Sequence, residues 1–125
     1  MLKGLRILIV EDEHLVAMDL AAAIEELDGH PIGPVPTVEE ALLLLQTEEI
    51  AAAILDANLL DRDITPVATI LAENAVPFVI HTGASVPPDL AARYPDLPVV
   101  PKPAGPTTVL AALLQLVSAD RSWFE

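Results

Sequence analysis

Apolar and polar residues follow one another in blocks along the chain, and these blocks predict alternating strands and helices. Short apolar runs that end at polar residues are typical of buried strands, and they occur at residues 5–10, 51–60, 77–81 and 97–100. The run at 51–60 is stopped by Asp56. A further strand is expected at 31–36. Apolar residues at spacings of three and four predict helices over residues 15–27, 38–45, 64–74 and 106–117, with a shorter one over 89–94.

Each helix is expected to bury one apolar stripe. Thr37 followed by Glu40 predicts a capping box for the second helix. Thr65 and Pro66 predict a cap and a first-turn proline for the third. The residues expected to face the core are Val16, Leu20, Ile24, Leu27, Val38, Ala41, Leu42, Leu45, Ile64, Val67, Ile70, Leu71, Leu110, Leu113, Leu114 and Val117.

The order of the elements predicts an α/β fold: a doubly wound five-stranded parallel sheet with helices on both faces. The strands are apolar throughout rather than alternating, as expected for strands that are covered on both sides. Because proline lacks a backbone N–H, it is tolerated at sheet edges, and the second and fifth strands carry the prolines. This selects the flavodoxin-like strand order 2-1-3-4-5. The second strand is expected to be short.

Length and hydropathy predict one soluble domain. We expect the domain to span residues 1–118 of the 125 and a C-terminal tail to span 119–125, in which Trp123 and Phe124 are candidates for docking back or contacting a partner. Mean hydropathy is high at +0.51. The apolar runs are nevertheless far shorter than the roughly 20 residues of a membrane-spanning helix. No secretory leader opens the chain, so a cytoplasmic location without membrane contact is expected.

The charge balance excludes some functions. The chain has 19 acidic and 6 basic residues and a formal net charge of −13, which argues against direct nucleic-acid binding because phosphates require clustered lysine and arginine. Most of these carboxylates keep an aliphatic domain in solution, and some would suit cations in an acidic cleft. The chain has no cysteine, which excludes disulfides and thiolate metal sites.

Chemically active side chains follow the predicted strands. Glu11 and Asp12 come after the first strand, Asp56 after the third, Thr82 after the fourth and Lys102 after the fifth. The carboxyl ends of parallel strands meet at one rim, where ligands bind. The neighbouring carboxylates would raise one another's pKa unless a cation lies among them. Mg²⁺, which binds through carboxylate oxygens, water and phosphate oxygens, fits such a site.

This order of motifs resembles the receiver domain of two-component response regulators. The resemblance covers nearly the whole chain and implies that Asp56 accepts a phosphoryl group from a sensor histidine kinase or a histidine phosphotransfer protein. It further implies that Thr82 and Lys102 contact the phosphoryl oxygens. It places Mg²⁺ on Glu11, Asp12, Asp56 and the backbone carbonyl of Asn58. The implied output is altered contact with a downstream protein or output domain, with the last helix and fifth strand as the surface expected for a homodimer.

The chain departs from the family pattern at several positions. Glu11 stands where many members have Asp, Val99 where a switch Tyr or Phe is usual, and Ala104 where Phe is common. The loop that follows Asp56 lacks the usual Pro and Gly. The stretch PFVIHTG resembles a subfamily with a Pro-Phe-x-x-x-Thr-Gly signature, and His81 within it is a candidate for lining the site.

Two other functions fit parts of this pattern. A Mg²⁺-dependent aspartyl phosphatase or phosphotransferase usually carries a second Asp two residues after the nucleophile, where this chain has Asn58. Reactions other than phosphorylation and dephosphorylation of the domain itself are therefore not expected. A receiver that no longer takes phosphate is a third interpretation, which the absent switch aromatic favours and the intact Asp56, Thr82 and Lys102 oppose. Glu11 and Asp12 are also expected to cap the first helix.

Overall fold

The computed structural model describes residues 2–118 and has the predicted order of strands and helices. The strands are β1 (Arg6–Val10), β2 (His30–Val35), β3 (Ala52–Leu55), β4 (Phe78–Thr82) and β5 (Val99–Pro101). The helices are α1 (His14–Glu26), α2 (Val38–Thr47), α3 (Thr65–Glu73), α4 (Pro88–Arg93) and α5 (Pro106–Ser118). All strand pairs are parallel and the order is β2-β1-β3-β4-β5, which confirms the predicted fold.

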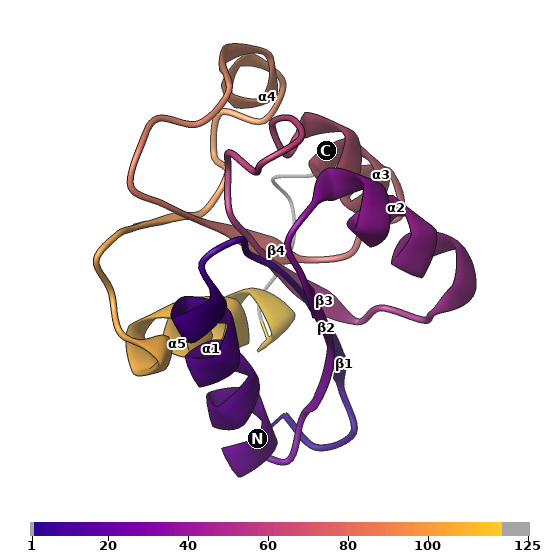
Figure 1. Ribbon diagram of the computed structural model, residues 1–125, viewed down its shortest axis with the longest axis vertical. Coiled ribbons are helices and arrows are strands. Elements are labelled where there is room, and N and C mark those ends of the chain that lie inside the picture. The colour runs from indigo at the N-terminus through magenta and orange to yellow at the C-terminus, as the bar shows by residue number, and fades with distance from the viewer. Residues whose placement is uncertain (1, 119–125) are drawn as a thin grey trace.

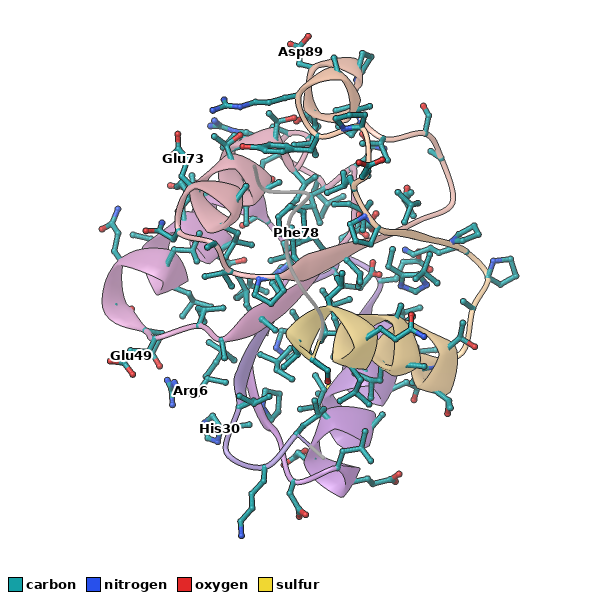
Figure 2. The ribbon with its side chains drawn as sticks, turned by 180° about the vertical axis from the view of Figure 1, so that it is seen from behind. Arg6, His30, Glu49, Glu73, Phe78 and Asp89 are labelled. Atoms are coloured by element: carbon teal, nitrogen blue, oxygen red, sulfur yellow. The ribbon has the colours of Figure 1, made fainter. Side chains whose placement is uncertain are left out.

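Helices cover both faces of the sheet, with α1 and α5 together on one face and α2 and α3 on the other (Figure 1). Successive strand residues point to opposite faces, so each strand contributes to two apolar clusters. Ile7 and Ile9 pack with α1 and α5, whereas Leu8 and Val10 pack with α2, α3 and α4. Figure 2 shows Phe78 inside the molecule, while Glu73 and Asp89 extend outward.

The edge positions of β2 and β5 confirm the inference from their prolines. The prediction that the second strand is short was wrong, because β2 spans six residues. Its pairing with β1 shifts between Leu8 and Val10, beside Gly33. Gly33 has a φ of 90°, and a Cβ there would lie 2.9 Å from the Val35 nitrogen and 3.1 Å from the Ile9 oxygen. This glycine lets a proline-containing edge strand continue past an irregularity.

Helix α3 differs from its prediction. Its buried side chains are Val67, Ala68, Leu71 and Ala72. Ile70 is 36% exposed, because the buried stripe passes instead through Ala68 and Ala72. Thr65 is not the cap, because it already lies in the helix and its N–H donates to Asp63 Oδ1 at 2.9 Å. Pro66 is in the first turn, as predicted.

Helix α2 begins as predicted. Thr37 Oγ1 accepts from the Glu40 N–H at 3.2 Å, and the Thr37 hydroxyl donates to Glu40 Oε2 at 3.0 Å. The predicted tail with Trp123 and Phe124 lies outside the described residues, so the division into domain and tail stays a prediction. Between residues 2 and 118, none of the helices has the length and apolarity needed to cross a membrane.

Candidate functional site

The strand ends bring the predicted residues together at the carboxyl edge of the sheet. Glu11 follows β1, Asp56 follows β3, Thr82 ends β4 and Lys102 follows β5. Two backbone hydrogen bonds hold these ends side by side, from the Asp56 N–H to the Val10 carbonyl and from the Lys102 N–H to the Thr82 carbonyl, both 2.8 Å. The sheet ladder therefore sets the position of each functional side chain.

Four carboxylates form an acidic cluster at this edge: Glu11, Asp12, Glu13 and Asp56 each offer an oxygen, and these oxygens lie within 4.8 Å of one another. Glu11 and Asp56 are buried, with 3% and 7% of their surface exposed. Burial, followed by hydrogen bonding with Asp56, raises the pKa of Glu11 to about 7. The same two causes raise the pKa of Asp12. Ionised carboxylates in the acidic cluster would therefore repel one another, and a bound cation would reduce this repulsion.

Lys102 supplies one cation to the acidic cluster. Its Nζ lies 3.0 Å from Glu11 Oε1, 3.3 Å from Asp56 Oδ2 and 2.7 Å from Glu13 Oε1. Burial alone would lower the pKa of Lys102, but the hydrogen bonds to Glu13 and Glu11 outweigh it and raise the pKa. The ammonium is therefore charged and occupies a position between the carboxylate that ends β3 and those that follow β1.

Glu13 was not predicted as a site residue. Its side chain is 59% exposed yet makes the shortest contact of Lys102. The only signal in the sequence is its place in the polar run that follows the first strand. The expectation that Glu11 and Asp12 cap α1 was wrong: Glu13 takes the cap position without a side-chain cap bond. The Glu13 N–H instead donates to Glu11 Oε2 at 3.1 Å, which orients Glu11 toward the site.

An open cleft of about 320 Å³ lies over the cluster. It is lined by Asp12, Glu13, Asp56, Asn58, Thr82, Gly83, Ala84 and Lys102. Thr82 Oγ1 accepts from the Ala84 N–H at 3.1 Å, so its own hydroxyl proton is available to a ligand in the cleft. Asn58 is exposed, and its N–H points to Asp56 Oδ1 at 3.5 Å. The structure thus brings Asp56, Asn58, Thr82 and Lys102 to one cavity.

His81 adjoins the acidic cluster but does not line this cleft. It is 2% exposed, and Nδ1 is 4.0 Å from Glu11 Oε1. Neither ring nitrogen has a hydrogen-bond partner among the described residues. Burial, followed by the charge of Lys102, lowers its pKa. His81 is therefore a neutral ring near neutral pH, packed beneath the charged groups.

The residues of the acidic cluster fit a Mg²⁺ ion. All the ligand atoms that they offer are carboxylate oxygens, the kind that Mg²⁺ prefers, and the cleft leaves room for water. The Lys102 ammonium already lies within 3.3 Å of oxygens of Glu11 and Asp56, so the position attracts positive charge. The raised pKa values of Glu11 and Asp12 also indicate that a positive charge at this position would be stabilising.

Solved structures with the same fold identify the family. No model of a known protein family and no curated protein matches the chain. It is 45% identical to SdrG from Sphingomonas melonis Fr1, with a TM-score of 0.71 over 89% of this chain and 97% of that one. It is 46% identical to the BeF3-activated conformation of SdrG from Pseudomonas melonis Fr1, with a TM-score of 0.68 over 91% and 99%. A response regulator receiver protein from Sinorhizobium medicae WSM419, 22% identical, shares the fold with a TM-score of 0.80 over 95% and 98%.

This domain belongs to the family of response-regulator receiver domains. Receiver domains are signalling modules of two-component systems, they generally bind Mg²⁺, and they interact with kinases and output partners. The fold, the acidic cluster and the basic residue after β5 all agree with that assignment. Membership of the subfamily with the Pro-Phe-x-x-x-Thr-Gly signature stays a prediction.

Proposed function

We propose that this domain accepts a phosphoryl group from a phosphohistidine onto Asp56 and passes the event on through altered protein contacts. The observation that carries the proposal is the position of the Asp56 carboxylate, which borders the open cleft 3.3 Å from the Lys102 ammonium. The carboxylate can be reached from solvent, and a cation lies beside the place where phosphoryl charge would arrive. Both are requirements of in-line phosphoryl transfer.

Asp56 is the proposed nucleophile. One of its oxygens forms a bond to phosphorus while the bond between phosphorus and the donor imidazole nitrogen breaks, and the electron pair of that bond stays on the nitrogen. Lys102 donates to one phosphoryl oxygen of the resulting acyl phosphate and Thr82 to another. Glu11, Asp12, Asp56 and the backbone carbonyl of Asn58 are the proposed holders of Mg²⁺. The bound ion would offset negative charge on the carboxylates and on the phosphoryl oxygens.

The proposed signal begins with Thr82 and Lys102. Both stand at the ends of strands that lead to the side of the domain formed by β4, α4 and β5. Contacts with a phosphoryl group would exist only in the phosphorylated state, so they can bias the position of these segments. The proposed donor is a sensor histidine kinase or a histidine phosphotransfer protein in the cytoplasm. The proposed recipient is a downstream protein or an output domain, and α5 with β5 is the proposed homodimer surface.

The test is an NMR titration of the whole chain with MgCl₂ and then with beryllofluoride. SdrG has been obtained in a BeF3-activated conformation, so the same probe suits this relative. We expect amide shifts around Asp56, Thr82 and Lys102 that saturate at one equivalent of beryllofluoride. Asp56→Asn should remove them. Absence of these shifts, or identical shifts in Asp56→Asn, would overturn the proposal and favour a module that does not take phosphate.

A further inference from the structure

The loop that follows Asp56 is closed on itself. Residues 57–64, the site loop, are joined at their base by a hydrogen bond of 2.9 Å from the Ile64 N–H to the Ala57 carbonyl. Asn58 and Asp63 form an isolated antiparallel bridge, and the Leu59 N–H donates to the Arg62 carbonyl at 3.1 Å. The site loop is therefore a small hairpin, with residues 60 and 61 at its tip.

The tip of the site loop is attached to a different element. Asp61 Oδ1 accepts from the Val38 N–H at 3.0 Å and Oδ2 accepts from the Glu39 N–H at 3.1 Å. These are the first two amides of α2, which otherwise lack partners in the helix. The bonds from Val38 and Glu39 lower the pKa of Asp61, which keeps it a carboxylate. The two contacts are called the Asp61 clasp below.

Apart from the Asp61 clasp, the hydrogen bonds that shape the site loop lie within the loop or at its base, where Ala57 and Ile64 are buried. The loop contains neither Pro nor Gly, the residues that usually restrict or shape such turns. Asn58 is exposed, and the hydrogen bond of its N–H to Asp56 is long at 3.5 Å. A group that must present its backbone to a metal ion benefits from support by neighbouring residues. In this domain Asp61 adds such support at the tip of the loop, which it joins to α2.

We infer that Asp61 is a positioning residue, which holds the site loop against α2 so that the backbone of Asn58 is prearranged beside Asp56 for Mg²⁺. The inference rests on the proposed function, because it assigns Asn58 to the metal. It goes further in giving α2 a role in the site, although α2 contributes no side chain to the cleft. The Asp61 clasp thereby makes metal affinity depend on a helix that lies beside the site.

A simple cap of α2 is the competing interpretation, and Thr37 provides a matched control for it. Thr37 caps the same helix, through its hydroxyl and the Glu40 N–H at 3.2 Å, but belongs to the chain that leads into α2. Thr37→Ala therefore weakens the helix start without releasing the site loop. Asp61→Ala weakens the same helix start and releases the loop as well. Any difference between the two variants beyond loss of a cap reports on the loop.

The experiment is a MgCl₂ titration of the wild type, Asp61→Ala and Thr37→Ala, followed by the amide shifts of residues 56–63. Backbone order of the same residues is measured by ¹⁵N relaxation without metal. We expect Asp61→Ala to bind Mg²⁺ about tenfold more weakly and to lose order in the site loop. Thr37→Ala should stay within about twofold of the wild type. Asp61→Asn, which keeps one acceptor oxygen, should recover part of both losses.

The outcomes separate this inference from the proposed function. Equal Mg²⁺ affinities and equal loop order in Asp61→Ala and Thr37→Ala would overturn the Asp61 clasp even if the wild type binds Mg²⁺ well. A wild type that does not bind Mg²⁺ would overturn the proposed metal site, and the relaxation data without metal would still decide whether Asp61 orders the loop. Circular dichroism on each variant shows whether it is folded at the temperature of measurement.

Discussion

On one flank of the acidic cluster, the site loop is tied to α2 by directional hydrogen bonds of 3.0 and 3.1 Å from Asp61. On the other flank, the helix of the α4 segment, residues 84–98, packs on the core through the buried side chains of Leu90 and Tyr94, while the ends of the segment are hydrogen-bonded to β4. Its helix is closed by backbone bonds within the segment, from Ala91 to Pro87 and from Tyr94 to Leu90. Directional bonds fix a loop in one position, whereas apolar contacts tolerate small displacements. The first flank therefore suits a metal site and the second suits a moving output surface.

The largest effect is expected from Leu90→Ala, which removes the buried side chain of α4. Loss of a buried leucine costs about 3 to 4 kcal/mol. Because Leu90 is the side chain that this helix buries, we expect the amides of Ala91 and Tyr94 to exchange with solvent on the order of a hundredfold faster. The amides of Val38 and Ile64 should keep their exchange rates. Val67→Ala in α3 is the control that should speed exchange on both flanks, and equal acceleration in Leu90→Ala would contradict the comparison.

A slightly smaller effect on stability is expected from the ionisation of Glu11 in the acidic cluster, which lies between the two flanks. The pKa of Glu11 is raised from 4.5 to about 7 in the folded state, so between these values the folded protein keeps a proton that the unfolded chain releases. Stability should therefore fall as pH rises through this window, by on the order of 3 kcal/mol.

Urea unfolding in EDTA, with Glu11→Gln as the comparison, measures this dependence. The variant cannot release a proton at this position, so its stability should change less over the same pH range. Addition of MgCl₂ should restore stability to the wild type at pH 7 and above. If the stability of the two proteins depends on pH in the same way without metal, the pKa of Glu11 is not raised in solution.

Removal of the Thr37 cap should have an intermediate effect on stability, and its effect on amide exchange should be limited to the flank that contains α2. Thr37→Ala is expected to lower the free energy of unfolding by about 1 kcal/mol, since the Glu40 N–H loses its acceptor. Amide exchange of Glu40 should increase, while that of Ala91 stays at its original rate. Denaturant unfolding gives the first value and exchange the second. Faster exchange at Ala91 would show that the flanks are coupled through the core.

The smallest effect on stability is expected from Val99→Phe, which restores an aromatic residue at a position where the family usually has one. Val99 is 42% exposed on the edge strand β5, so a larger side chain displaces little and the free energy of unfolding should change by less than about 0.5 kcal/mol. The informative measurement is the amide shift of Ala84 and Leu90 on beryllofluoride binding. We expect it to grow relative to the wild type. An unchanged shift would mean that the α4 segment responds independently of this position.

The fold and the predicted cluster at the strand ends could be derived from the sequence because both follow from local patterns. Apolar strands bounded by polar residues set the sheet, edge prolines set its order, and parallel strands bring their ends to one rim. The sequence pattern alone therefore predicts that Asp56, Thr82 and Lys102 lie together. The roles proposed for them rest on chemistry and on the family.

The remaining features depend on contacts between distant segments. Nothing near Asp61 in the sequence indicates that it binds the first amides of α2, because the fold alone brings them together. Glu13 could not be distinguished from a solvated residue, since its contact with Lys102 requires the position of β5. The spacing of apolar residues predicts that Ile70 faces the core, but the buried stripe of α3 passes through Ala68 and Ala72 instead.

The contact of Glu13 with Lys102 also affects how strong a phosphorylation signal can be. The ammonium already has a partner at 2.7 Å before any phosphoryl group arrives. Under the proposed function, Lys102 exchanges its ion pair with Glu13 for one with the phosphoryl group. The free energy available for switching is the difference between these two ion pairs rather than the full strength of the new one. Because Glu13 is exposed, its released carboxylate returns to water at little cost. The strength of the ion pair between Glu13 and Lys102 in the unphosphorylated state thus contributes to the free-energy difference between the two states of the domain.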